Sequence, residues 1–481
     1  MTRSRPGLLL VTGAVGALAA APRARAQEPV RQIVITGTQQ RLALPDCVPE
    51  AGDEASRQAC ETVTGVLRSD LAFQGLFRFV DESLYSALGQ VVPDAPDFED
   101  WQSLFANFLV ATRARVTGET MEVELFVYAV DSTQRILTRG YSGRSDEARL
   151  FAHRLADDVM ALTPYEGIAQ TRLVFSSDRD DPDGDGSIKE LYIADYDGHN
   201  VRRMTVNRSL NILPAWSPDG STLAYVSYRS GTPDVYLAQV RAGQSLNLTG
   251  SRGQSFAPAW SPDGRRVAYA SSRSGDMEIW IANADGTDHR NVSNNRAADT
   301  APTWSPNGRE IAFTSNRGGT PQLWLMDADG LNVRRLTRVG SWSDGAVWSP
   351  SRINSEIAYS SRLEAGTFEV AVIDLETRQV RQLTTGRGSC EAPAWSPNGR
   401  HLVFACNRNR RWHLALVDRL GHQLQTLDVG PGNSVYPDWE PRASRGGLTL
   451  TRSAAGVTGR TDATAGGAES SGTDPWSRRS P

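Results

Sequence analysis

The sequence predicts an α/β N-terminal domain followed by an all-β six-bladed β-propeller with four-stranded blades. A phrase of the form Trp-Ser-Pro-Asp/Asn-Gly recurs through the second half of the chain, in shortened form at two places. Its tryptophans are spaced by 44, 44, 44, 47 and 44 residues. Each interval holds four strand-sized segments, which is typical of propeller repeats. The tryptophans that mark the six expected blades are Trp216, Trp260, Trp304, Trp348, Trp395 and Trp439.

The repeat around Trp216 shows how one blade forms. Residues 214–217 read as a short strand that ends in a Pro-Asp-Gly turn, where proline presets φ, aspartate accepts local hydrogen bonds and glycine adopts positive φ. Three more strands are expected over residues 222–228, 234–240 and 245–249. A single sheet of this kind buries its faces against neighbouring blades, and tryptophan suits the space between them.

The two ends of the repeat region are each incomplete. Residues 173–205 carry three strands without a preceding tryptophan strand, whereas residues 436–441 carry a tryptophan strand with no further strands after it. We expect these segments to form one blade together, which would hide both sheet edges and close the ring. The alternative is an offset frame without such a clasp.

The N-terminal part lacks the repeat and predicts a small α/β domain. A helix is expected over residues 54–71, because Ala59, Val63, Leu67 and Leu71 recur at helical spacing. A second helix is expected from an N-cap at Ser145 to about residue 162. Strands are expected over residues 32–35, 77–80, 108–116, 121–130 and 136–141.

The chain begins with a segment that has the features of an export signal. Arg3 and Arg5 precede an apolar stretch over residues 8–21, and Ala24-Arg25-Ala26 matches the cleavage pattern before Gln27. We therefore expect an exported protein without membrane insertion. The expected boundaries are 1–26 for the signal peptide, 27–165 for the α/β domain, 166–170 for a linker, 171–441 for the propeller and 442–481 for a disordered tail.

Charge and cysteine content narrow the class of protein further. The net charge of −4 gives no general case for nucleic-acid binding. The four cysteines form two local pairs, Cys47 with Cys60 and Cys390 with Cys406. Cys390 and Cys406 fall opposite each other on the first two strands of one blade, which predicts a disulfide; two unpaired buried thiols are the alternative.

Two series of arginines are expected on one face of the disc. Arg208, Arg252, Arg296, Arg338 and Arg387 all fall on the long loops that join one blade to the next. A second series follows the second strand of each blade and consists of Arg229, Arg273, Arg317, Arg362 and Arg408. Guanidinium groups gathered on one face would attract an acidic partner. The alternative is that each arginine pairs with a local aspartate or caps a hairpin.

An acidic loop is the candidate metal site. Asp181, Asp183 and Asp185 match the first half of a calcium-binding loop. The twelfth position is Tyr192 and not glutamate, so the usual bidentate ligand is missing, and a solvated acidic turn is the alternative. The six histidines are scattered and follow no metal-ligand spacing.

The domain order together with the repeat resembles the TolB family of the Tol–Pal system, as does the motif Asp195-Tyr196-Asp197-Gly198. The resemblance covers about residues 30–441 and implies a monomeric, periplasmic, non-enzymatic adaptor without a cofactor. It further implies that the propeller binds a peptidoglycan-associated lipoprotein (Pal-like), and that the N-terminal region from Gln27 contacts a TolA-like inner-membrane protein. Such a protein would support outer-membrane integrity and cell division. The four cysteines, the acidic loop and the tail depart from the family pattern.

A different kind of propeller is the alternative function. An exported propeller of this size could bind or act on a small molecule or glycan in its central channel. That reading requires a cluster of His, Asp or Glu side chains lining the channel. A serine hydrolase is disfavoured, because no G-x-S-x-G motif is present.

Overall fold

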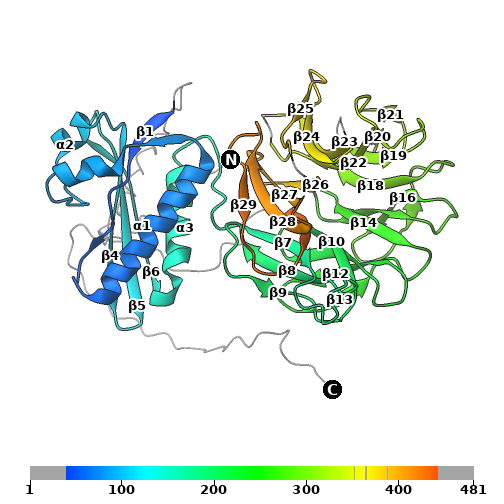
Figure 1. Ribbon diagram of the computed structural model, residues 1–481, viewed down its shortest axis with the longest axis horizontal. Coiled ribbons are helices and arrows are strands. Elements are labelled where there is room, and N and C mark those ends of the chain that lie inside the picture. Colours follow the sequence, from blue (N-terminus) through cyan, green and yellow to red (C-terminus); the bar gives the residue numbers. More distant parts are fainter. Residues whose placement is uncertain (1–38, 352, 363–365, 387, 442–481) are drawn as a thin grey trace, which may run out of the picture.

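The computed structural model describes residues 39–351, 353–362, 366–386 and 388–441. These residues form two lobes that lie side by side, an α/β domain and a propeller (Figure 1). The expected signal peptide at 1–26, the expected strand at 32–35, Arg387 and the expected tail at 442–481 lie outside the described residues. None of the described helices is long and apolar enough to cross a membrane.

The α/β domain is built on one sheet with the strand order β3-β1-β4-β5-β6, and β2 pairs with β4. The strands are β1 (Gln40–Ala43), β2 (Val48–Pro49), β3 (Phe77–Phe79), β4 (Phe108–Thr117), β5 (Thr120–Ala129) and β6 (Gln134–Arg144). The hairpin of β4 and β5 turns at Gly118, whose φ is +60°. This confirms the expected hairpin and third strand, whereas β1 and β2 were not expected from the sequence.

Helices cover both faces of this sheet. The helices α1 (Glu54–Gln74) and α3 (Ala148–Met160) share one apolar core with the sheet, and α2 (Phe98–Ser103) and the 3-10 turn η1 (Glu82–Ala87) pack on the other face. Asp53 caps α1 by accepting a hydrogen bond from the Ser56 backbone N–H. The expected N-cap at Ser145 is wrong. That residue begins a 3-10 turn, η2 (Ser145–Glu147), and no side chain caps α3, which starts only after this turn.

The propeller has six four-stranded sheets, which confirms the expected fold class. Blades one to three comprise β10 (Asn211–Trp216), β11 (Thr222–Ser227), β12 (Asp234–Gln239), β13 (Ser245–Asn247), β14 (Ser255–Trp260), β15 (Arg266–Ser271), β16 (Glu278–Asn283), β17 (Arg290–Asn291), β18 (Asp299–Trp304), β19 (Glu310–Ser315), β20 (Gln322–Asp327) and β21 (Arg334–Arg335). Blades four and five comprise β22 (Trp342–Trp348), β23 (Glu356–Arg362), β24 (Glu369–Asp374), β25 (Val380–Gln382), β26 (Cys390–Trp395), β27 (His401–Arg408), β28 (Arg411–Asp418) and β29 (Gln425–Leu427).

The sixth sheet, here called the closing blade, joins the two ends of the propeller. It consists of β30 (Ser434–Trp439), β7 (Arg172–Ser177), β8 (Glu190–Asp195) and β9 (Arg202–Arg203), in that spatial order. The backbone N–H of Arg172 donates to Glu440 Oε2 over 3.1 Å, and its guanidinium pairs with the same buried carboxylate. The expected closure by pairing of the C-terminal strand is therefore confirmed.

The repeated tryptophans connect neighbouring blades. The indole N–H of Trp260 donates to the carbonyl of Ala215 over 3.2 Å, and Trp304 donates in the same way to Ala259. The tryptophan strand of each blade also packs against that of the next blade, so these strands surround the central channel. The repeat thus determines both the turn within a blade and the contact between blades.

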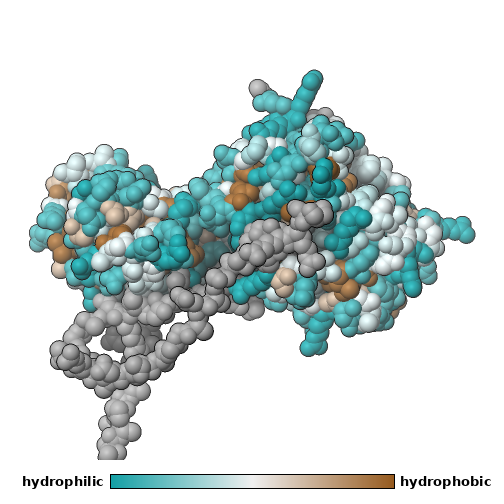
Figure 2. All heavy atoms as spheres, turned by 90° about the horizontal axis from the view of Figure 1, so that it is seen from below, coloured by the Kyte–Doolittle hydropathy of each residue, from teal (hydrophilic) through white to brown (hydrophobic). Residues whose placement is uncertain are grey.

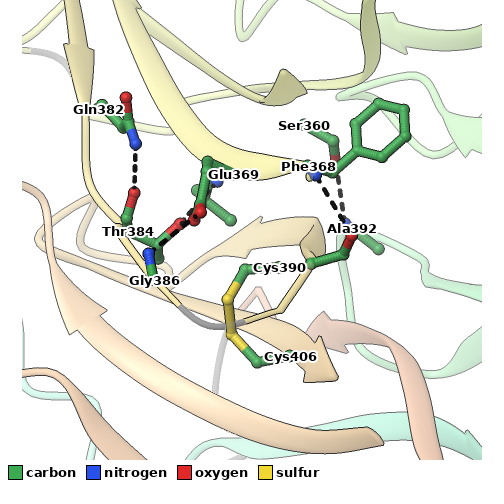
Figure 3. Close-up of a disulfide and its surroundings, with 11 residues drawn as sticks. Ser360, Phe368, Glu369, Gln382, Thr384, Gly386, Cys390, Ala392 and Cys406 are labelled. Carbon is green, nitrogen blue, oxygen red and sulfur yellow. Dashed lines mark hydrogen bonds between the residues drawn. A yellow bond between two sulfur atoms is a disulfide. The ribbon is translucent and has the colours of Figure 1, made fainter. Parts of the chain in front are cut away.

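Both expected disulfides are present. Cys47 is bonded to Cys60, which ties the segment around β2 to α1, and Cys390 is bonded to Cys406 across β26 and β27 (Figure 3). In the second blade the corresponding positions are serines, and the Ser255 and Ser271 hydroxyls lie 3.0 Å apart. The disulfide replaces a cross-strand hydrogen bond that another blade makes with serine side chains.

The disc has two different faces. The turn face carries the Ser-Pro-Asp/Asn-Gly turns and the turns between third and fourth strands; the loop face carries the hairpins between second and third strands and the loops between blades. The α/β domain packs against the turn face at the fifth and closing blades, where Arg400 donates to the carbonyl of Gln74 and Asn398 donates to that of Glu166. Hydrophilic residues cover most of the described surface seen from below, and apolar patches are small (Figure 2).

Candidate partner-binding surface and domain interface

Four of the five predicted arginines of the first series lie on the loop face. Arg208, Arg252, Arg296 and Arg338 are exposed, each on the loop that precedes the tryptophan strand of a blade. Their guanidinium groups form no hydrogen bond or ion pair with any residue that the structure describes. These side chains therefore remain available to an external partner. The fifth member, Arg387, falls outside the described residues.

In five of the six blades, a buried polar residue at the start of the third strand holds the loop that joins this blade to the next. Glu190 accepts the backbone N–H of Arg208 over 2.8 Å, and Glu278 accepts that of Asn295, next to Arg296, over 2.6 Å. Asp234 binds its loop in the same way through the backbone N–H of Ser251. Glu369 does so through that of Gly386 (Figure 3). In the third blade Gln322 donates to the carbonyl of Gly340 over 3.3 Å instead. The loops are thus anchored from beneath while their arginines stay exposed.

The environment shifts the pKa of two of these anchors in opposite directions. Burial raises the pKa of Asp234, but hydrogen bonds from Ser251, Thr249 and Ser230 outweigh it and hold the pKa below its usual value. Burial raises the pKa of Glu278, and its hydrogen bonds do not fully offset that effect.

Sequence reasoning missed these anchors. Glu190, Asp234, Glu278 and Glu369 each lie 18 residues before an arginine of the first series. That fixed spacing was the available signal.

The second arginine series has a structural role in the blades. Arg229 lies over the ring of Tyr236 at 3.8 Å, and Arg273 lies over that of Trp280 at 4.9 Å. Arg317 pairs with the buried Asp299 at 2.7 Å. Apart from the exposed Arg408, the described members of this series therefore stack on aromatic rings or pair with a local carboxylate.

The mouth of the channel on the loop face contains a cavity of about 370 Å³. Lys189, Glu391, Trp412 and Tyr436 are among its lining residues. Burial raises the pKa of Glu391, and the nearby Asp344 raises it further. The cavity therefore combines aromatic surface with a small number of charged groups.

The acidic loop that was predicted to bind calcium borders this cavity. Asp181 accepts the backbone N–H of Gly186 over 2.7 Å, and Asp185 accepts that of Ser187 over 2.8 Å. Asp183 is exposed. Two of the three carboxylates thus stabilise the turn itself, and calcium binding stays a prediction from the sequence.

The interface between the two lobes contains a buried polar cluster. Asp70 on α1 is 2.7 Å from His153 Nδ1 on α3 and accepts the hydroxyl of Tyr196 over 2.6 Å. Burial raises the pKa of Asp70, although the His153 hydrogen bond opposes this effect. Burial lowers the pKa of His153, but the hydrogen bond and charge of Asp70 leave it above its ordinary value. Asp197, also on the propeller, pairs with Arg149 on α3.

A second histidine at the interface stays neutral. His401 Nε2 donates to the carbonyl of Phe73 over 2.9 Å, and the two rings stack with their centres 4.2 Å apart. Burial lowers the pKa of His401 to about 3. At neutral pH the residue therefore donates this hydrogen bond as an uncharged imidazole.

Comparison with known proteins decides the family. The TolB beta propeller domain matches residues 159–443, which is more than half of the 481 residues, and the TolB amino-terminal domain matches residues 31–136. The chain belongs to the TolB family.

Named TolB relatives share part of this sequence. The Tol-Pal system protein TolB of Desulfosudis oleivorans is 34% identical over 204 residues, which are 41% of this chain and 45% of the relative. That of Geobacter metallireducens is 33% identical over 198 residues, again 41% and 45%. The chain thus matches slightly less than half the length of these relatives.

The fold is similar over a larger share of the chain. The crystal structure of TolB from Acinetobacter baumannii superposes with a TM-score of 0.72 at 26% identity, covering 84% of this chain and 97% of that one. This TolB structure has the same architecture of an α/β domain and a six-bladed propeller.

Proposed function

We propose that this TolB-family chain is a non-enzymatic periplasmic adaptor of the Tol–Pal cell-envelope system. Its propeller would bind a peptidoglycan-associated lipoprotein through the loop face, and its N-terminal region would contact an inner-membrane Tol protein. In this role it supports outer-membrane integrity and cell division. The observation that carries the proposal is the exposed arginine set on a face that the chain's own α/β domain leaves uncovered.

Physical properties of the loop face support a protein partner. Guanidinium groups bind carboxylates with two parallel hydrogen bonds, and several of them on one surface speed up the encounter with an acidic partner. Because Glu190 and Glu278 fix the loops from beneath, little conformational entropy is lost when a partner binds. An anchored, charged surface of this kind suits a specific but reversible complex.

Properties of the domain interface support the adaptor role. Contacts from α1 and α3 reach two blades of the propeller, through His401 in the fifth blade and Tyr196 in the closing blade. A change at one lobe can therefore bias the position of the other, which is the requirement for coupling two partners.

In-cell crosslinking tests the proposal. A photo-crosslinking residue is placed at Gln254, which is exposed beside Arg252 on the loop face, and in a matched control at Arg265, which is exposed on the turn face of the same blade. We expect the peptidoglycan-associated lipoprotein to be captured from Gln254 and not from Arg265. Equal capture from both positions, or none from Gln254 in cells that contain the lipoprotein, would contradict the proposal.

The cavity at the channel mouth favours a second function, the binding of a small molecule or glycan. Its aromatic lining at Trp412 and Tyr436 and its carboxyl group at Glu391 are suited to a sugar or a cationic ligand. Under this function, Trp412→Ala removes binding of a glycan fragment, and Arg252→Ala does not. Under the adaptor function, Arg252→Ala weakens lipoprotein binding more than Trp412→Ala does.

A further inference from the structure

Three metal-ligating side chains from both lobes meet at the domain interface. His153 comes from α3, whereas Asp195 ends β8 and Asp197 lies in the turn that follows it. One ligand atom from each residue lies within 4.8 Å of the other two. Within the described part of the chain, no other group of His, Cys, Asp and Glu side chains converges in this way.

The imidazole of His153 is oriented as a metal ligand. In the neutral ring with its proton on Nδ1, that nitrogen donates to Asp70 and the other nitrogen, Nε2, presents a lone pair. Nε2 is buried, has no hydrogen-bond partner among the described residues, and lies 3.7 Å from Asp197 Oδ2. A carboxylate that holds the far nitrogen of a ligating histidine is the usual arrangement around protein-bound zinc.

The spacing argues against a simple ion pair. If Nε2 carried a proton, it would be expected to donate to Asp197, but 3.7 Å is beyond hydrogen-bond range. In a tetrahedral zinc site, two ligand atoms are separated by about 3.3 Å, because each lies about 2.0 Å from the ion. The observed separation therefore needs only a small contraction to hold an ion between the two atoms.

The charges of the cluster leave room for a divalent cation. Asp70, Asp195 and Asp197 supply three carboxyl groups, and among the described residues Arg149 is the only Lys or Arg side chain that forms an ion pair with one of them. Arg172, which also lies near Asp195, is already engaged by Glu440. Three carboxyl groups beside one guanidinium group make a site whose charge suits a divalent cation.

We propose that His153, Asp195 and Asp197 bind one divalent cation of the zinc class. A mixed set of imidazole nitrogen and carboxylate oxygen suits zinc better than calcium or magnesium, which take oxygen ligands. Water completes the coordination on the open side, where His199 Nδ1 lies 3.3 Å from Asp197 Oδ1 and offers a further donor. Since the ligands come from both lobes, the ion fastens α3 to the propeller and limits movement between them.

Zinc titration of the purified protein tests the site. After chelator treatment and removal of the chelator, calorimetric titration with zinc chloride is expected to show one equivalent bound and a rise in the unfolding temperature. Cobalt(II) is expected to bind with the visible absorption of a four-coordinate complex. Asp195→Asn is expected to weaken zinc binding at least tenfold; Asp195 is only half-buried, so this variant should retain the fold.

A matched control separates this site from general binding by surface histidines. His422 lies 3.5 Å from Asp418 in the corresponding turn of the fifth blade and has no third ligand beside it among the described residues. His422→Ala is therefore expected to bind zinc like the unmodified protein. Equal zinc affinity in the unmodified protein, Asp195→Asn and His153→Asn, or an absence of stoichiometric binding, would overturn the proposal and leave His153 as a residue of a hydrogen-bonded interface.

Discussion

The two faces of the propeller use similar residues for different purposes. On the turn face, Arg400 contacts the other lobe, Asp197 pairs with Arg149 of that lobe, and His401 is buried against it. On the loop face, Arg252 and Arg296 are exposed and unpaired with described residues, although buried acids fix the loops that carry them. The α/β domain covers the turn face at the fifth and closing blades, and among the described residues it makes no contact with the loop face. Whether an arginine is used in a structural contact or is exposed therefore depends on its position relative to the buried anchors and not on its residue type.

The largest expected effect comes from the buried ion pair that closes the ring. Glu440→Ala leaves Arg172 partly buried without its partner, so we expect a loss of about 3–5 kcal/mol in the free energy of unfolding. Glu310→Ala breaks the more exposed pair with Arg334 and is the control, with an expected cost below about 1 kcal/mol. Urea unfolding measures both. Similar costs for the two variants would contradict the role assigned to the closing pair.

The loop anchors come next. Glu278→Ala leaves the backbone N–H of Asn295 and the hydroxyl of Ser293 without an acceptor, so we expect a cost of about 1–3 kcal/mol. Hydrogen exchange should increase in the loop over residues 292–298 and change little on the turn face. Glu376→Ala, at an exposed position, serves as the control. Unchanged exchange in that loop would show that Glu278 does not anchor it.

Acid should weaken the turn face selectively. The pKa of His401 is about 3 in the folded protein, below the usual value of about 6.5 for an unfolded chain. The stabilisation from neutral His401 is therefore complete above about pH 6.5 and is lost as the pH falls towards 3, with about 2 kcal/mol lost by pH 5. In His401→Gln, the pH dependence of unfolding between pH 7 and 5 should be smaller by this amount. An identical pH profile in the variant would rule out His401 as its source.

The smallest effect on stability is expected for the exposed arginines. Arg252→Glu and Arg296→Glu should change the free energy of unfolding by less than about 0.5 kcal/mol. They should nevertheless slow association with the proposed partner, the peptidoglycan-associated lipoprotein, and make the association rate less dependent on salt. Arg229→Glu is the contrasting variant, because it removes the cation stacked on Tyr236 and should destabilise the blade. Unchanged association rates in the first two variants would exclude electrostatic steering by this face.

Much of the fold could be predicted from the sequence, because the main features of the propeller are local and repeated. The tryptophan spacing predicted six blades, and the offsets of Cys390 and Cys406 from Trp395 predicted their cross-strand pairing. By contrast, β1 is only four residues long and pairs in parallel with β3 and β4, which lie far along the chain. A strand this short contains too few residues to show a periodic pattern, so β1 was not predicted. The six-residue α2 was not predicted either, because it too is short.

The candidate sites divide in the same way. The first arginine series could be predicted from the sequence because nearly all its members have the same offset from a tryptophan. The structure was needed to show that the second series differs from it, because arginines of the second series stack on aromatic residues of the third strands. The group of His153, Asp195 and Asp197 is assembled from two lobes, over a separation of more than 40 residues. No sequence motif predicts that these side chains lie close together, because their proximity depends on how α3 packs against the closing blade.

The pairing of β30 with β7 has a consequence for biosynthesis. Glu440 and Trp439 bond to residues 268 positions earlier, so the disc cannot close until almost the whole propeller has been synthesised. A product that ends before β30 leaves the hydrogen-bonding edge of β7 uncovered and lacks the acid that neutralises Arg172. We therefore expect truncated chains to be cleaved by proteases more readily than chains in which the ring has closed.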